Sequence, residues 1–79
     1  MIIVTGAAGF IGSCLVGELL RAGYADIVAV DDFSRTDKAR NLEGKKLTAR
    51  VHRNDFLAWL DANENQVQFI FHLGARTVA

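Results

Sequence analysis

The sequence has one cysteine, no excess of charge of either sign and no long hydrophobic run. The single thiol, Cys14, cannot form a disulfide within the chain, which favours a reducing, cytoplasmic setting. Nine basic and nine acidic residues balance, so the chain as a whole has no electrostatic preference for nucleic acid. No apolar run approaches the roughly 20 residues that span a bilayer, and no signal peptide is recognisable at the amino terminus. We therefore expect neither a membrane protein nor a nucleic-acid-binding protein.

Metal-ligand spacing is missing as well. His52 and His72 are far apart in the sequence and Cys14 has no second cysteine, so no metal site is expected. What the sequence does contain is 51% hydrophobic and 23% charged residues, which is typical of a globular protein. A chain of 79 residues forms one domain at most, and it buries only about 60% of the surface that it exposes when unfolded.

Positive charge gathers between residues 35 and 53, which include seven basic and two acidic residues. This segment is either a solvated surface with loops or the source of one or two cations for a cofactor phosphate.

Short apolar runs alternate with amphipathic segments along the chain. The continuously apolar run at residues 1–5 predicts a buried parallel strand, and apolar residues at helical spacing predict a helix over residues 10–21 that stops near Gly23. Further strands are expected at residues 26–30, 47–52 and 67–71. We expect at most a short helix at about residues 37–42, and a helix that Asn54 or Asp55 could cap. This order predicts an α/β fold with a parallel sheet and helices on both faces.

A glycine-rich loop, TGAAGFIG at residues 5–12, lies between the first expected strand and the first expected helix. Gly6 permits a sharp turn out of the strand, Gly9 lets a ligand approach the backbone, and Gly12 lets the helix pack tightly against the sheet. The amides of Phe10 and Ile11, at the positive end of the helix, are the expected donors to a diphosphate. In this context the motif predicts binding of a dinucleotide pyrophosphate rather than a turn without a ligand.

An acidic residue, Asp31, follows the second expected strand, 19 residues after Gly12. At that place a carboxylate accepts hydrogen bonds from the adenosine ribose, which favours NAD, although Asp31 could also be only a turn residue. Arg35 and Lys38 follow closely and could instead neutralise the 2′-phosphate of NADP. The residues therefore leave the choice between NAD and NADP open.

Two further strand ends could contribute, because ligands of parallel α/β sheets bind at the carboxyl ends of the strands. After the third expected strand, Asp55 and Phe56 either contact adenine or serve only as a helix cap and a core residue. After the fourth, Gly74 and Ala75 are small enough for a cofactor to lie against the backbone. His72, at the same strand end, is expected to be a partly buried structural residue.

These motifs together resemble a known family. The glycine spacing at residues 5–12, the acid at Asp31 and the sequence HLGA at residues 72–75 are similar to the extended short-chain dehydrogenase/reductase group, which has a Rossmann fold. The resemblance covers the whole chain and implies an NAD(P)-dependent epimerase or dehydratase that acts on a nucleotide sugar. A complete doubly wound fold of this type has six strands. Residues 1–79 are therefore expected to be the N-terminal βαβαβαβ portion of a dinucleotide-binding domain, without the substrate domain.

Within this group, the opening sequence MIIVTGAAGFIGS and the stretch DDFSRTDK at residues 31–38 are similar to the bacterial ADP-glyceromanno-heptose 6-epimerases. That resemblance implies NADP held by the backbone of Phe10 and Ile11 and by a further set of residues: Asp31, Asp32, Lys38, Arg53 and the loop Leu73, Gly74, Ala75, Arg76 and Thr77. Asp32 departs from an asparagine expected in some members, and its negative charge weighs against NADP, so NAD is the alternative.

The family's chemistry implies residues that this sequence lacks. The subfamily epimerises a sugar carbon by transient hydride transfer to the cofactor, with a Tyr-x-x-x-Lys pair and a serine or threonine. The only tyrosine, Tyr24, is followed four residues later by Val28, so no catalytic residue is assigned. We expect the catalytic pair and the sugar pocket in a longer protein that could form homo-oligomers, and this segment to be inactive alone. The alternatives are another nucleotide-sugar epimerase or dehydratase, a non-catalytic nucleotide sensor and a truncated product without function.

Overall fold

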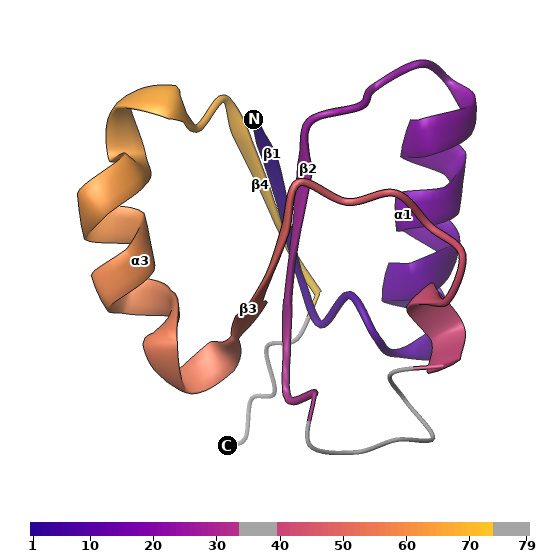
Figure 1. Cartoon of the computed structure of the whole chain (residues 1–79). Helices are drawn as coiled ribbons and strands as arrows, with labels where there is room; N and C mark the ends of the chain where they lie inside the picture. Colours follow the sequence, from indigo (N-terminus) through magenta and orange to yellow (C-terminus); the bar gives the residue numbers. More distant parts are fainter. Residues whose placement is uncertain (34–39, 74–79) are drawn as a thin grey trace.

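The computed structural model describes residues 1–33 and 40–73 (Figure 1). In this part of the chain the elements are, in order, β1 (Ile2–Thr5), α1 (Phe10–Arg21), β2 (Ile27–Asp31), the 3-10 helix η1 (Arg40–Leu42), β3 (Ala49–His52), η2 (Arg53–Asp55), α3 (Phe56–Asn63), η3 (Glu64–Gln66) and β4 (Phe69–His72). The four expected strands form, with ends shifted by one or two residues. The predicted contacts of Lys38, Gly74, Ala75, Arg76 and Thr77 lie outside the described residues. None of the described helices is both long and apolar enough to span a bilayer.

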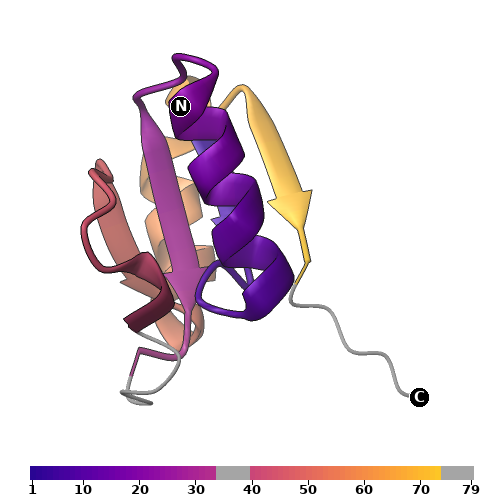
Figure 2. The ribbon, with the colours of Figure 1, turned by 90° about the vertical axis from the view of Figure 1, so that its right-hand side faces the viewer.

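The four strands are parallel and form one sheet in the order β3-β2-β1-β4. β1 is central, because Val4 pairs with Ala29 of β2 on one side and with Phe71 of β4 on the other. Parallel neighbours cannot be joined by tight turns, so each connection crosses over a face of the sheet. Figure 2 shows β3 at one edge and β4 at the other, with α1 in front of the sheet. The predicted parallel sheet is confirmed.

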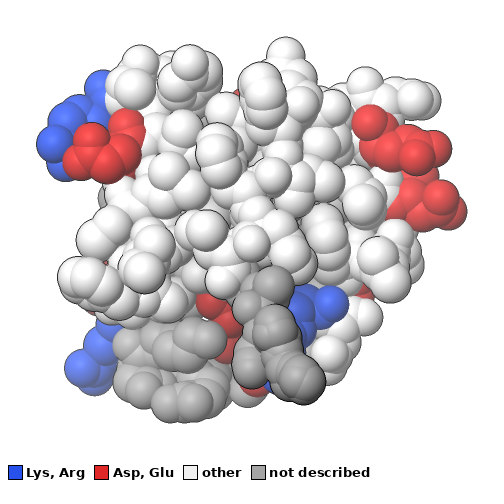
Figure 3. Space-filling view, turned by 180° about the vertical axis from the view of Figure 1, so that it is seen from behind, with Lys and Arg blue, Asp and Glu red and all other residues white. Residues whose placement is uncertain are grey.

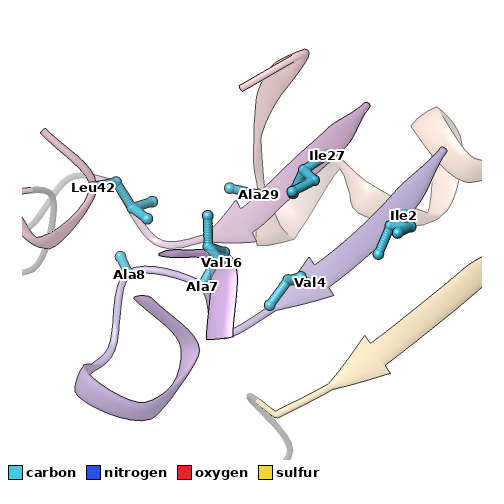
Figure 4. Close-up of a cluster of buried hydrophobic side chains, with 8 residues drawn as sticks. All are labelled: Ile2, Val4, Ala7, Ala8, Val16, Ile27, Ala29 and Leu42. Carbon is cyan, nitrogen blue, oxygen red and sulfur yellow. The ribbon is translucent and has the colours of Figure 1, made fainter. Parts of the chain in front are cut away.

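Alternating strand residues build two apolar layers, one on each face of the sheet. On one face, Ile2 and Val4 of β1 belong to a buried cluster with Val16 of α1 and Leu42 of η1 (Figure 4). The opposite cluster consists of Ile3, Val28, Val30 and Val51, with Phe56, Trp59 and Leu60 of α3 packed against it. Figure 1 accordingly shows α1 and α3 on opposite sides of the sheet. The prediction of helices on both faces is confirmed.

The connection from β2 to β3 was expected to contain at most a short helix at about residues 37–42. Residues 34–39 lie outside the described part of the chain, and the described remainder of that range forms the three-residue helix η1, in agreement with this expectation. Leu42 is completely buried in the cluster on the α1 face, and its neighbours Arg40 and Asn41 are exposed. Phe33 and Leu47 pack against the same cluster, so three apolar residues of the described part of this connection hold it to the α1 face of the sheet.

The start of α3 differs from the prediction that a side chain of Asn54 or Asp55 caps this helix. Asp55 is the N-terminal cap residue, but its side chain makes no capping hydrogen bond. The His52 ring instead accepts a hydrogen bond from the Asn54 amide at 3.1 Å, within the turn η2. The predicted side-chain cap is wrong, because a 3-10 turn leads directly from the end of β3 into the helix. Phe56 packs against the buried cluster on this face, in agreement with its interpretation as a core residue.

β4 is an exposed edge of the sheet within the described part of the chain. Its apolar residues Phe69, Ile70 and Phe71 are 65%, 45% and 37% exposed, whereas β1 and β2 are buried throughout. Within the described residues β4 pairs only with β1, so one backbone edge and both faces lack a cover. Figure 3 shows this side of the molecule, where charged side chains lie near the margins and the centre is uncharged. An apolar edge of this kind favours pairing with a further strand.

Candidate cofactor-binding site

The glycine-rich loop leaves β1 at the carboxyl edge of the sheet and is fixed there by backbone hydrogen bonds. Gly6 has a φ of +68°, a left-handed conformation that residues with side chains disfavour. The amides of Gly6 and Ala7 donate to the carbonyl of Val30 at 2.8 and 3.3 Å. Ala7 and Ala8 are fully buried. The loop therefore makes the sharp turn predicted at Gly6 and follows one defined path beside β2.

Gly12 allows α1 to begin directly against this loop. A Cβ atom at Gly12 would lie 2.1 Å from the carbonyl oxygen of Gly6 and 2.8 Å from its carbon, well inside contact distance. Both atoms belong to the backbone, which cannot rotate away as the end of a flexible side chain can. Gly12 thus permits close packing, as predicted, but the nearest atoms belong to the glycine-rich loop and not to the sheet.

Gly9, in contrast, faces open space. It is the N-terminal cap residue of α1 and has an extended backbone with a φ of −74°, which any residue can adopt. Within the described part of the chain, a Cβ built at Gly9 would have only the Gly6 oxygen within 4 Å, at an ordinary contact distance of 3.4 Å. An open cavity of about 370 Å³ lies beside it, lined by Gly6, Gly9, Phe10, Ile11, Gly12 and Leu73. The bare backbone of Gly9 therefore borders space that a ligand can enter.

The beginning of α1 is suited to an anion. The first amides of an α-helix have no partner within the helix and form its positive end. Gly9 supplies no capping side chain, and the first turn of α1 contains no acidic residue. A diphosphate fits this environment, because amide hydrogen bonds and the helix dipole both stabilise negative charge.

Asp31 has a structural partner in this loop. Its side chain lies at the end of β2 and the residue is 5% exposed. One carboxylate oxygen accepts a hydrogen bond from the Ala8 amide at 2.8 Å, and the other accepts one from the Asp32 amide at 2.6 Å. Asp31 therefore anchors the glycine-rich loop to β2, a role that the sequence analysis did not assign. Its contact with an adenosine ribose stays a prediction.

Asp32 and Arg53, both predicted from the family resemblance, lie close together at the ends of β2 and β3. The Arg53 Nη2 and Asp32 Oδ2 atoms are 3.9 Å apart. The other Asp32 oxygen, Oδ1, lies 3.1 Å from Nε2 of His52, a residue to which the sequence analysis gave no role. His52 pairs with Asp31 in the register of the two strands, which places its ring beside this pair of acids.

The sequence profile of the NAD dependent epimerase/dehydratase family matches residues 2–79. The chain belongs to this family. Two relatives are ADP-L-glycero-D-manno-heptose-6-epimerases: that of Alkalilimnicola ehrlichii is 47% identical over 77 residues, and that of Cupriavidus pinatubonensis is 48% identical over 77 residues. The matches cover 95% and 96% of this chain but 24% and 23% of the relatives. The chain thus spans about a quarter of the length of the curated relatives that it matches.

A solved structure of an epimerase has the same fold as this member of the epimerase/dehydratase family. The UDP-glucuronic acid 4-epimerase from Bacillus cereus, in complex with NAD, superposes with a TM-score of 0.73 and is 31% identical. The superposition covers 99% of this chain and 27% of the epimerase. The predicted Rossmann-type fold is confirmed, as is the resemblance to this family and, within it, to heptose 6-epimerases.

Two further side-chain hydrogen bonds connect the elements around the site of this epimerase/dehydratase family member. Asn41 of η1 donates its side-chain amide to the carbonyl of Ala8 at 2.7 Å, a contact across 33 residues that no local pattern signals. At the other side of β1, Thr5 Oγ1 and His72 Nδ1 are hydrogen-bonded at 2.8 Å. His72 is exposed, so the expectation that it is partly buried is wrong. Its strand lies at the edge of the sheet that the described residues form, with β1 as its one neighbour there.

We expect Asp31→Asn to lower the free energy of unfolding by about 1–3 kcal/mol. The two carboxylate oxygens of Asp31 face backbone amides, and the Asn side chain places an NH₂ group against one of them. Urea denaturation followed by far-UV circular dichroism measures the loss. Asp61→Asn, at an exposed position of α3, is the matched control and should change stability by less than about 0.5 kcal/mol. Equal effects of the two substitutions would contradict the anchoring role of Asp31.

Proposed function

We propose that these residues form the dinucleotide-binding portion of a longer nucleotide-sugar epimerase, and that the β1–α1 loop holds the pyrophosphate of NADP or NAD. One observation carries the proposal: the bare backbone of Gly9 borders an open cavity at the positive end of α1. A diphosphate at that place receives amide hydrogen bonds and lies favourably in the helix dipole. The family is described as NAD dependent, and the structural relative from Bacillus cereus is in complex with NAD, which supports the proposal.

The proposed contacts fall into three groups. The pyrophosphate lies against Gly6, Gly9, Phe10, Ile11 and Gly12. The adenosine end lies near Asp31, Asp32, Lys38 and Arg53, where β2 and β3 end. The loop that follows β4 contributes Leu73, Gly74, Ala75, Arg76 and Thr77. These groups come from neighbouring carboxyl ends of one parallel sheet, the edge at which such sheets bind ligands.

We propose NADP as the cofactor, with NAD as the alternative. Asp32 adds a negative charge next to Asp31, which opposes binding of a 2′-phosphate. The neighbouring Arg53 guanidinium, 3.9 Å from the Asp32 carboxylate, offsets part of that charge. Lys38 supplies a second proposed cation from the residues that the family resemblance implies.

The proposed activity of the longer protein is that named for its relatives, the epimerisation of an ADP-glyceromanno-heptose. The bound dinucleotide supplies a transient hydride acceptor. The residues of this chain bind and orient it, because the loop is held by β2, Asp31 and Asn41 before any ligand arrives. We propose that a Tyr-x-x-x-Lys pair and the sugar pocket lie in the remainder of the protein, so that this segment is inactive by itself.

The exposed edge at β4 supports the view that residues 1–79 are the N-terminal part of a larger dinucleotide-binding domain. A further strand beside β4, with helices over its two faces, would cover Phe69, Ile70 and Phe71. A cytoplasmic location, proposed from the single cysteine, and a homo-oligomeric assembly stay predictions for the longer protein.

The test is a titration of the longer protein that carries these residues with NADPH and with NADH, followed by cofactor fluorescence. We expect NADPH to bind with a dissociation constant in about the micromolar range, and the protein to epimerise ADP-glyceromanno-heptose. Binding of neither dinucleotide would overturn the proposal. Binding without epimerisation, in a protein that lacks a Tyr-x-x-x-Lys pair, would identify a nucleotide sensor instead.

A further inference from the structure

His52 makes two hydrogen bonds that together define where its ring proton lies. The Asn54 amide is 3.1 Å from His52 Nδ1, and a backbone N–H can only donate. Nδ1 is therefore the acceptor and carries no proton. The remaining ring nitrogen, Nε2, carries the proton and donates it to Asp32 Oδ1 at 3.1 Å. The turn η2 thus sets the tautomer, and the tautomer makes His52 a donor to Asp32.

This donor draws the Asp32 carboxylate toward β3. His52 ends β3 and its side chain is 33% exposed, while the Asp32 side chain is 25% exposed, so both groups are partly withdrawn from water. Arg53, the next residue, lies near the second carboxylate oxygen at 3.9 Å. Asp31, in contrast, is committed to the glycine-rich loop through Ala8. Two adjacent carboxylates are therefore held by different elements and in different directions.

We propose that His52 is a positioning residue that sets the preference between NADP and NAD through Asp32. The inference rests on the proposed function. NADP differs from NAD by a 2′-phosphate on the adenosine ribose, and a carboxylate near that group repels it while accepting a hydrogen bond from the 2′-hydroxyl of NAD. By donating to Asp32 Oδ1, Nε2 of His52 satisfies one carboxylate oxygen and offsets part of its charge, which lowers the repulsion that NADP meets. Without the Nε2 donor, this oxygen accepts from the 2′-hydroxyl of the ribose instead, and NAD is favoured.

The test compares His52→Leu with His52→Gln in the longer protein that carries these residues. Leucine removes the donor, whereas the glutamine amide nitrogen can take the place of Nε2. The dissociation constants for NADPH and NADH are measured by fluorescence titration for each variant. We expect His52→Leu to raise the ratio of the NADPH constant to the NADH constant by about three- to ten-fold, in keeping with loss of one charge-assisted hydrogen bond. His52→Gln should leave the ratio within about two-fold of the wild-type value.

A double-mutant comparison shows whether His52 acts through Asp32. In an Asp32→Asn background, His52→Leu should no longer change the ratio, because the charge that it positions is gone. A purely structural role would weaken both dinucleotides equally and leave the ratio unchanged in every background, which would overturn the inference. An equal shift with and without Asp32 would overturn it as well. Binding of neither dinucleotide to the wild-type protein would instead refute the proposed function, and the inference with it.

Discussion

Gly12→Ala is expected to lower the free energy of unfolding by about 3 kcal/mol or more, the upper range for overpacking a folded interior. The added Cβ would lie 2.1 Å from the carbonyl oxygen of Gly6, so either the loop or the first turn of α1 must move. The loop cannot move easily, because the amides of Gly6 and Ala7 are hydrogen-bonded to the carbonyl of Val30. For a domain of this size the loss corresponds to a fall in Tm of more than about 10 °C. Urea and thermal denaturation followed by circular dichroism measure both quantities.

Gly17→Ala is the matched control for this substitution, since it makes the same chemical change five residues further along α1. Among the described atoms, a Cβ at Gly17 would contact only Lys45 Cε, at 3.5 Å, an ordinary distance to a flexible side chain. Alanine also favours the helix over glycine by about 0.5–1 kcal/mol, so this variant should gain stability. If Gly12→Ala and Gly17→Ala both stabilise the protein, the close approach of α1 to the loop is contradicted.

Gly9→Val is expected to weaken dinucleotide binding by at least about 100-fold, or about 2.7 kcal/mol, while the protein stays folded. The valine side chain would project into the cavity beside the loop, where the pyrophosphate is proposed to lie. The fold tolerates the change, because Gly9 has an extended backbone and its Cβ would meet only the Gly6 oxygen, at 3.4 Å, among the described atoms. Fluorescence titration of the longer protein with NADPH measures the affinity, and a thermal melt confirms folding.

Gly17→Ala again provides the control, because Gly17 lies in the same helix but does not line the cavity. Its affinity for NADPH should stay within about two-fold of wild type. A Gly9→Val protein that folds and keeps wild-type affinity would show that the ligand does not approach this part of the loop. Substitutions at Gly12 and Gly9 therefore test two uses of glycine in one motif: we expect Gly12 to be needed for the fold and Gly9 for the proposed ligand.

Much of the fold could be predicted from local pattern. The helix at residues 10–21 was predicted with the bounds that α1 has, because its apolar stripe and its flanking glycines lie within one continuous segment. The strands were predicted to within two residues for the same reason. The connection from β3 to β4 was harder: a side-chain cap was predicted at Asn54 or Asp55, and the turn η2, capped by the ring of His52, takes its place. Whether a capping side chain or a 3-10 turn begins that helix depends on the conformation at the end of β3. Helix propensities of single residues do not predict that conformation.

The site was predictable only in part. The glycine-rich loop is a contiguous motif, so its position and the jobs of Gly6 and Gly12 could be expected in advance. The roles of Asp31 and His52 could not, because their partners Ala8 and Asp32 lie about 20 residues away in the chain. Asn41 is a similar case, since it reaches Ala8 from a different connection. Hydrogen bonds of this kind exist only once the ends of neighbouring strands have been brought together.

The amino-acid sequence by itself determined the order of strands and helices, the loop between the first strand and helix, and the family. Each of these depends on residues that are close together in the chain, where the spacing of apolar residues and glycines favours one local conformation. Only the tertiary structure decided that β4 lies at an open edge, that Asp31 is committed to the loop, and that His52 donates to Asp32. The physical reason is that strand order and side-chain partners depend on contacts between segments far apart in sequence, and no local periodicity encodes which segments meet.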